Sequence, residues 1–173
     1  MPRNATTQPL PGDARRSPPT SALHALSQAC LHEQTLRIYF EDTDAGGIVY
    51  HASWLRFFER ARTDWLRSLG LEQSHLARDH GVGFVVRAMQ IGYLRPARLD
   101  DLVRTELRLL DLRGASISLA QHALLDDPRT PLVEAQVRVA VMRLSDGRPA
   151  PLPPALRERV SAQAATVTPV DQA

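Results

Sequence analysis

Hydrophobic and polar residues alternate along the last long segment of the chain, PLVEAQVRVAVMRL at 131–144. Successive side chains of an extended strand point to opposite faces, so this alternation gathers the apolar residues on one face. One face holds Val133, Ala135, Val137, Val139 and Val141, and the other holds Glu134, Gln136 and Arg138. The pattern predicts a strand with one buried face.

Four more segments have the composition of strands. They are residues 34–40, 82–94, 101–112 and 115–126. In the first of them Leu36, Ile38 and Phe40 share one face. Short connections such as RG and DPRT join neighbouring strands antiparallel, because a parallel return needs a long crossover.

A helix is predicted between the first strand and the other four, over SWLRFFERARTDWLRSLG at 53–70. Its apolar residues recur at helical spacing, at Trp54, Phe58, Ala61, Trp65 and Leu69. The hydroxyl of Ser53 can cap the first turn, and Gly70 can adopt the left-handed conformation that ends a helix.

This order of elements predicts an α+β domain of two layers. A helix with two tryptophans and two phenylalanines is unusually apolar, so we expect the sheet to curl around it. The expected arrangement is a hotdog fold, in which a five-stranded antiparallel sheet wraps around one central α-helix. We assign this domain to residues 33–152.

Both ends of the chain look peripheral to that domain. Residues 1–32 begin with five prolines among small and polar residues, which predicts a flexible extension. Residues 153–173 are expected to be a tail, with a short helix over 155–160.

Composition narrows the function classes. The 173 residues suit one domain, and 21 cationic side chains, all of them arginine, are offset by 19 acidic ones without a dense basic run. Nucleic acid binding is therefore not expected.

Cys30 is the only cysteine, which excludes an intrachain disulfide and fits a cytoplasmic protein. No apolar run reaches the length of a membrane span, so we expect a soluble protein.

The loop FEDTDAGGIVYHASW at 40–54 is the best candidate for chemistry, because it joins a strand end to a helix start. Gly46 and Gly47 allow close backbone approach, and the unpaired amides of the helix can stabilise a carbonyl oxygen that gains negative charge. Asp42 or Asp44 could then attack that carbonyl carbon or activate water. The alternative is that these aspartates only cap the helix or bond within the loop.

Histidines do not suggest a metal site. His51 lies near the helix start, where it can also simply pack. We expect His75, His80 and His122 to lie on separate elements, so no second histidine has ligand spacing.

The run RIYFEDTDAGGIVYHASWLRFFERARTDWLRSLG resembles the signature of the 4-hydroxybenzoyl-CoA thioesterase superfamily. Within it, the run is most similar to the Tol-Pal-associated acyl-CoA thioesterases (YbgC-like proteins), whose pattern is close to Y-x-E-D-T-D-A-x-G-x-V-Y-H followed by F-x-E-R-A-R. The similarity covers about residues 36–152. It implies hydrolysis of acyl-CoA thioesters without metal or cofactor, by a domain that pairs through its sheets into dimers and usually tetramers.

The resemblance also implies roles for residues of the loop. Asp44 matches the catalytic carboxylate, a nucleophile or general base, and Asp42 matches a position that bonds within the loop. His51 matches the residue whose backbone amide polarises the thioester carbonyl and whose side chain assists. The expected substrate-binding positions are Gly47, Ile48, Val49, Tyr50, Trp54 and Glu59.

Several assignments stay open at this point. Trp54 can narrow an acyl pocket or pack in the core, and Glu59 is read as a structural partner of Arg60 or Arg62 rather than a catalytic group. Possible contacts to CoA phosphates are Arg87, Arg95, Arg98 and Arg113, whereas Tyr93 is read as a strand aromatic.

Two other functions compete with a thioesterase. A hotdog hydratase would place its histidine five residues after its aspartate, whereas His51 lies seven residues after Asp44. The second is a non-catalytic module or scaffold linked to the Tol-Pal system that binds acyl-CoA or acyl carrier protein, and acyl carrier protein is also a possible source of substrate.

Overall fold

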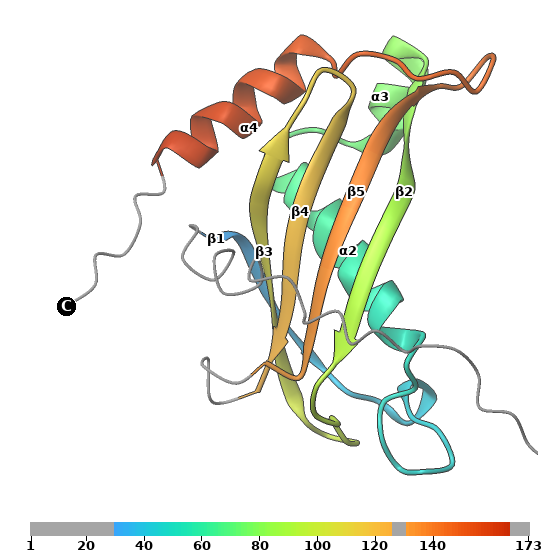
Figure 1. Cartoon of the computed structure of the whole chain (residues 1–173), viewed down its shortest axis with the longest axis vertical. Coiled ribbons are helices and arrows are strands. Elements are labelled where there is room, and N and C mark those ends of the chain that lie inside the picture. The colour runs from blue at the N-terminus through green and yellow to red at the C-terminus, as the bar shows by residue number, and fades with distance from the viewer. Residues whose placement is uncertain (1–29, 126–130, 167–173) are drawn as a thin grey trace, which may run out of the picture.

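The computed structural model describes residues 30–125 and 131–166. Its five strands form one antiparallel sheet in the order β1-β3-β4-β5-β2 (Figure 1). They are β1 (Cys30–Arg37), β2 (Val82–Tyr93), β3 (Leu102–Leu112), β4 (Ser116–Leu124) and β5 (Val133–Arg143). The predicted five-stranded antiparallel sheet is confirmed. The predictions for residues 1–29, 126–130 and 167–173 lie outside the described residues.

The long helix α2 (Ser53–Ser68) lies against one face of the sheet (Figure 1). Trp54, Phe57 and Phe58 in its first half pack with the apolar ends of β3, β4 and β5, and Trp65 and Leu66 pack at the other end. The helix therefore contributes to both buried clusters of the domain. Phe58 is fully buried, so its truncation to alanine should cost about 3–5 kcal/mol. The predicted apolar stripe is confirmed, with Leu69 half-buried at its end.

The two ends of α2 differ in how well the sequence predicted them. Gly70 has φ of +69°, and the bonds Gly70 N to Arg67 O and Leu71 N to Leu66 O form the expected glycine-terminated motif. The N-cap prediction was wrong. Ser53 is the first helical residue and its hydroxyl donates to the carbonyl of Asp42, because the chain before it already turns at Ala52.

Strand β1 is shifted along the sequence relative to its prediction. It starts at Cys30, inside the segment predicted as an extension, and ends at Arg37. Phe40, predicted to share a strand face with Leu36 and Ile38, is 82% exposed in the short 3₁₀ helix η1 (Phe40–Asp42). The reason is that Asp42 N donates to Tyr39 O, which turns the chain out of the sheet.

Two further helices flank the sheet. Helix α3 (Gln73–His80) was not predicted, and it carries both His75 and His80, so the expectation that these histidines lie on separate elements was wrong. The C-terminal helix α4 (Pro154–Thr166) begins near the predicted one and is longer. Leu156 and Val160 of α4 are fully buried against the Trp65 end of the core.

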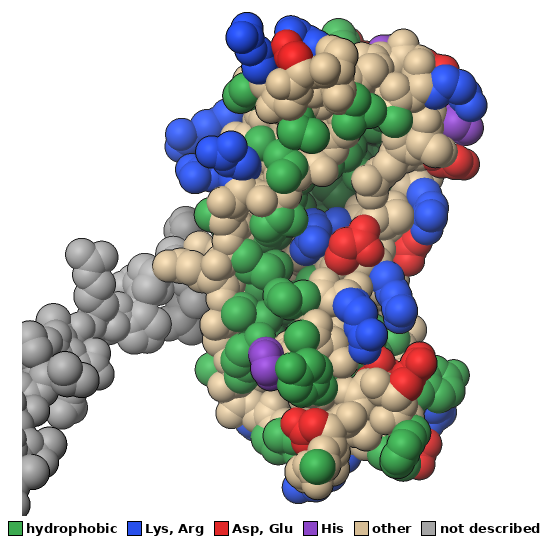
Figure 2. All heavy atoms as spheres, turned by 90° about the vertical axis from the view of Figure 1, so that its right-hand side faces the viewer, with side chains coloured by type: hydrophobic (Ala, Val, Ile, Leu, Met, Phe, Trp, Pro, Cys, Tyr) green, Lys and Arg blue, Asp and Glu red, His purple; other side chains and the backbone are tan. Residues whose placement is uncertain are grey.

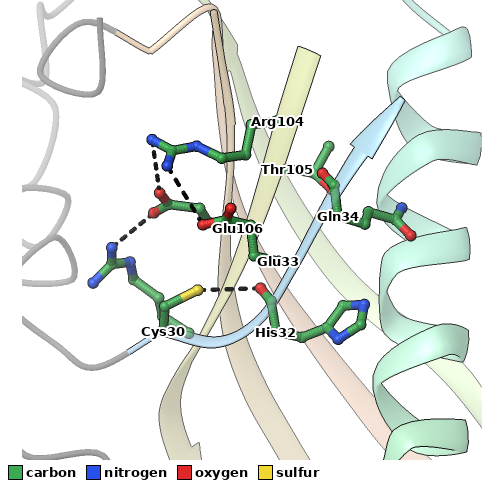
Figure 3. Close-up of polar contacts among 8 residues, drawn as sticks. Cys30, His32, Glu33, Gln34, Arg104, Thr105 and Glu106 are labelled. Carbon is green, nitrogen blue, oxygen red and sulfur yellow. Dashed lines mark hydrogen bonds and ion pairs between the residues drawn. The ribbon is translucent and has the colours of Figure 1, made fainter. Parts of the chain in front are cut away.

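A group of ion pairs lies on one face of the sheet, two of them within β3 and one between β3 and β1 (Figure 3). Arg104 lies 3.5 Å from Glu33 and 3.5 Å from Glu106, and Arg108 lies 2.7 Å from Glu106. Glu106 is almost buried, so the two guanidinium groups offset the cost of removing its carboxylate from water. The Cys30 thiol donates to His32 O at 3.1 Å, and burial raises the pKa of this thiol.

Candidate active site

The loop after η1 folds as a small hairpin. Thr43 and Val49 form an antiparallel bridge, Asp44 N donates to Ile48 O at 3.0 Å, and Gly47 N donates to Asp44 O at 2.9 Å. Gly47 has φ of +70°, a left-handed conformation that costs a residue with a Cβ about 1–2 kcal/mol. The hairpin therefore presents Asp44 at the start of a tight turn.

The Asp44 side chain is exposed at this turn. Its Oδ1 accepts a hydrogen bond of 2.8 Å from the amide of Gly46, which fixes the direction of the carboxylate. A Cβ at Gly46 would lie only 3.0 Å from that oxygen. Within the described chain Oδ2 has no hydrogen-bond donor, so this oxygen is available to a ligand or to water.

Asp42 is the buried counterpart of Asp44, only 5% exposed. Its Oδ2 accepts from Tyr39 N at 3.0 Å, and its Oδ1 lies 3.5 Å from Arg56. Its backbone carbonyl accepts from Tyr50 N at 2.8 Å and from the Ser53 hydroxyl at 3.2 Å. Asp42 therefore bonds within the loop, as the resemblance implied, and ties η1 to the start of α2.

The far side of the hairpin is anchored to the segment between β2 and β3. Val49 N donates to Ala97 O at 2.9 Å, and both side chains are buried in the cluster around Trp54. Ile48 is half-buried, whereas Tyr50 is exposed. Of the predicted substrate-binding positions in the loop, Val49 is thus an anchor, and Gly47 and Tyr50 face solvent.

His51 lies where the hairpin meets α2. Among the residues that the structure describes, no acceptor bonds to its backbone amide. Its ring is exposed, 4.4 Å between centroids from Tyr50 and 6.2 Å, edge to face, from Tyr93. The Tyr93 hydroxyl donates to His51 O at 3.2 Å. Sequence reasoning missed this role of Tyr93, because nothing local signals a contact across 42 positions.

The two predicted residues inside α2 lie in different surroundings. Trp54 is 3% exposed and packs edge to face against Phe57, with ring centroids 5.6 Å apart, which favours the core-packing alternative. Glu59 is exposed and accepts a hydrogen bond of 2.7 Å from the Thr63 hydroxyl. Glu59 is thus a structural hydrogen-bond partner, as predicted, and its charge also raises the pKa of Arg62, against the larger lowering by burial.

Glu59 also lies at the rim of a pocket of about 110 Å³ between α2 and the sheet. Side chains of β2, β4 and β5 make its floor apolar, namely Phe84, Val86, Ile117, Leu119 and Val139. The face of the molecule that carries α2 and the edge strand β2 is hollowed, and hydrophobic side chains gather in the hollow (Figure 2).

The arginines proposed for CoA lie at both ends of the molecule. Arg95 and Arg98 flank Ala97, whose carbonyl binds the hairpin, so they are close to the loop. Arg87 is exposed in β2 at the position where its pairing with β5 shifts. Arg113 lies beyond the opposite end of β3, about 35 Å from the loop at the rise of a strand, and pairs with Asp111. Of these four arginines, Arg95 and Arg98 thus lie in the segment that anchors the hairpin.

The described residues were also predicted to lack a metal site and a membrane-spanning segment. No group of three or more His, Cys, Asp or Glu side chains among them is placed to hold a metal ion. No helix in the same part of the chain has the length and apolarity to cross a bilayer.

Comparison with known families assigns most of the chain to one of them. The sequence model of the thioesterase-like superfamily matches residues 38–160, which include the hairpin, α2 and all strands from β2 to β5. The chain belongs to the thioesterase-like superfamily. Its relatives include an acyl-CoA thioesterase YbgC of Haemophilus influenzae, 42% identical over 118 residues that cover 68% of this chain and 85% of the relative. The acyl-CoA thioester hydrolase YbgC of Escherichia coli O157:H7 is equally identical over 87% of its length.

Solved structures support the fold and the enzyme class. A probable thioesterase from Bartonella henselae superposes with a TM-score of 0.65 at 38% identity, over 70% of this chain and 98% of that one. A thioesterase from Thermus thermophilus, solved with coenzyme A and Zn, gives 0.66 at 28% identity, over 79% and 96%. The hotdog fold and the similarity to YbgC-like thioesterases are confirmed, and the chain is a thioester hydrolase.

Proposed function

We propose that the protein hydrolyses acyl-CoA thioesters at the hairpin, with Asp44 and His51 as the catalytic residues. One observation carries this assignment: an exposed carboxylate, oriented by the Gly46 amide, lies in the same loop as a helix start where the His51 amide has no acceptor among the described residues. In acyl transfer to water, a carboxylate can act as the base and a free amide can donate to the developing oxyanion.

The chemistry follows from these groups in either of two forms. As a general base, Asp44 takes a proton from water while the water oxygen bonds to the carbonyl carbon, and the His51 amide donates to the carbonyl oxygen as it becomes negative. As a nucleophile, a carboxylate oxygen of Asp44 bonds to that carbon and forms an anhydride that water then hydrolyses. In both forms the carbon–sulfur bond breaks, the thiolate takes up a proton, and the products are a carboxylic acid and the thiol. The exposed His51 ring can assist the departing sulfur.

CoA is the proposed carrier because the YbgC relatives are named acyl-CoA thioesterases and a structural neighbour was solved with coenzyme A. Arg95 and Arg98 are proposed to bind its phosphates, because they lie within two residues of Ala97, which anchors the hairpin. Gly47, Ile48 and Tyr50 are proposed to line the path of the thioester. Acyl carrier protein remains the alternative carrier.

A homodimer or homotetramer is also proposed. β2 is the last strand of the sheet, and Val86 and Tyr93 on it are exposed, which supports pairing of two copies through this edge. In an antiparallel pairing the Tyr93 end of one β2 would lie opposite the Val82 end of the other. The hairpin of one copy would then approach the apolar pocket beside Glu59 of its partner, which suits an acyl group. Cytoplasmic location and the Tol-Pal link stay predictions.

Thiol release from a panel of acyl-CoAs, from acetyl to octanoyl and including benzoyl, tests this function. Turnover of at least one member is expected. Saturable binding of acyl-CoA without release of thiol would instead favour the non-catalytic module.

A further inference from the structure

Tyr93 stands out because its hydroxyl binds the backbone of the proposed oxyanion-binding residue, a role that neither the sequence pattern nor the family resemblance assigned to it. It is the last residue of β2. The hydroxyl donates to the carbonyl oxygen of His51 at 3.2 Å, and its ring meets the imidazole edge to face.

The backbone that carries Tyr93 is firmly held. Tyr93 is paired with Val133 in the ladder between β2 and β5. Directly after it, the amides of Leu94 and Arg95 both donate to Leu132 O, at 2.8 and 3.1 Å. Leu132 and Val133 are buried. The hydroxyl therefore projects from a rigid strand end rather than from a loop.

The His51 carbonyl is available to Tyr93 because the first turn of α2 is tighter than an α-helical turn. In a regular α-helix the amide of Leu55 would donate to His51 O, four residues earlier. It donates instead to Ala52 O at 3.2 Å. The carbonyl of His51 is thus released from the helix ladder and accepts the phenolic proton.

Both peptide groups that flank His51 are consequently fixed. Ser53 N donates to Tyr50 O at 2.8 Å, which fixes the peptide plane between Tyr50 and His51. Since this peptide is planar and trans, its N–H, the proposed oxyanion donor, points away from Ser53. The next peptide, between His51 and Ala52, is held by Tyr93 alone among the described residues.

We propose that Tyr93 is a positioning residue that holds His51 in the orientation needed to bind the thioester carbonyl in the transition state. The inference rests on the proposed function of His51. A donor that is already oriented stabilises the transition state without reorganising, so its misplacement lowers kcat rather than raising KM.

Tyr93→Phe is the sharpest test, because it removes the hydroxyl and keeps the ring that touches His51. Steady-state kinetics on the best acyl-CoA of the panel should give a kcat about three- to tenfold lower, with KM within about twofold. The unfolding midpoint in urea should match that of the native chain. Tyr39→Phe is the matched control, since Tyr39 is exposed near the same loop and bonds to Asp42 through its backbone amide.

The outcomes separate this inference from the proposed function when Asp44→Asn is measured in the same assay. If Asp44→Asn abolishes turnover while Tyr93→Phe and Tyr39→Phe have equal kcat, the role of Tyr93 is refuted and the function stands. A raised KM at unchanged kcat in Tyr93→Phe would refute it too. If Asp44→Asn keeps normal turnover, the proposed site itself fails.

Discussion

The indole nitrogen of Trp65 in α2 donates a hydrogen bond of 2.8 Å to Oε1 of Gln163 in α4. The same Gln163 side chain donates from Nε2 to Leu31 O in β1 at 2.7 Å. One amide of the C-terminal helix therefore satisfies polar groups of the central helix and of an edge strand.

Gln163→Ala should destabilise the domain because it leaves the buried indole N–H and a strand carbonyl without their partner. Such a loss costs about 1–3 kcal/mol of unfolding free energy. Urea unfolding followed by tryptophan fluorescence measures the change. Ser161→Ala, on the exposed side of α4, serves as the control and should stay within about 0.5 kcal/mol of the native chain. Equal stability of the two variants would show that the two hydrogen bonds of Gln163 do not stabilise the domain.

Stability should also decrease in mild acid because of a buried histidine. Burial lowers the pKa of His122 to about 4 from an ordinary value of 6.5, Arg108 adds to the decrease, and Glu106 opposes it. Between these two values the unfolded chain binds a proton that the folded chain does not. The stabilisation is therefore complete above about pH 6.5 and is lost as pH falls toward 4, by at most about 3 kcal/mol.

His122→Phe should reduce this pH dependence, measured as urea unfolding free energies from pH 7 to pH 4.5. Some slope should remain, since burial also lowers the pKa of His32. His75→Gln changes an exposed histidine and should keep the native slope. A native slope in His122→Phe would contradict the assignment.

Gly46→Ala should impair turnover more than stability. The new Cβ would lie 3.0 Å from Oδ1 of Asp44, so the carboxylate must move, whereas the backbone there requires no left-handed conformation. We expect kcat to fall about tenfold or more, which corresponds to roughly 1.4 kcal/mol of lost transition-state stabilisation.

Gly147→Ala provides the converse control. Gly147 has φ of +70° with open space around its Cβ position, in the turn after β5. Its substitution should cost about 1–2 kcal/mol of stability and leave kcat unchanged. If Gly46→Ala were as active as Gly147→Ala, the orientation of Asp44 by the Gly46 amide would not matter for turnover.

Hydrophobic patterns predicted the elements that bury one face and expose the other. Residues Val133 to Val141 alternate because one face of β5 covers the core, and the stripe on α2 is periodic for the same reason. Helix α3 has only Leu76 buried, so no hydrophobic period could reveal it. In α4 the last fully buried residue is Val160, and beyond it only the half-buried Ala164 packs against the core, among small residues that favour a helix.

The site was predictable only in part. Local spacing was enough to propose Asp44, the glycines and His51, because they share one short loop. The contact of Tyr93 with His51 depends on the pairing of β2 with β5 and on the tightened first turn of α2, which no local pattern encodes. Ser53 was misplaced by one position because serine suits both an N-cap and a first turn whose hydroxyl finds a nearby carbonyl.

The most direct test of the account is the rate of thiol release by Asp44→Asn on the best acyl-CoA of the panel, with a protein-only blank to correct for the Cys30 thiol. Asn keeps the size of the side chain and its bond from the Gly46 amide, and removes the base and nucleophile. Asp79→Asn, an exposed aspartate on α3 paired with Arg78, is the matched control. We expect Asp44→Asn to lose at least a hundredfold in kcat with an unchanged unfolding midpoint, while Asp79→Asn keeps native turnover. Near-native turnover in a folded Asp44→Asn protein would contradict the assignment of the active site.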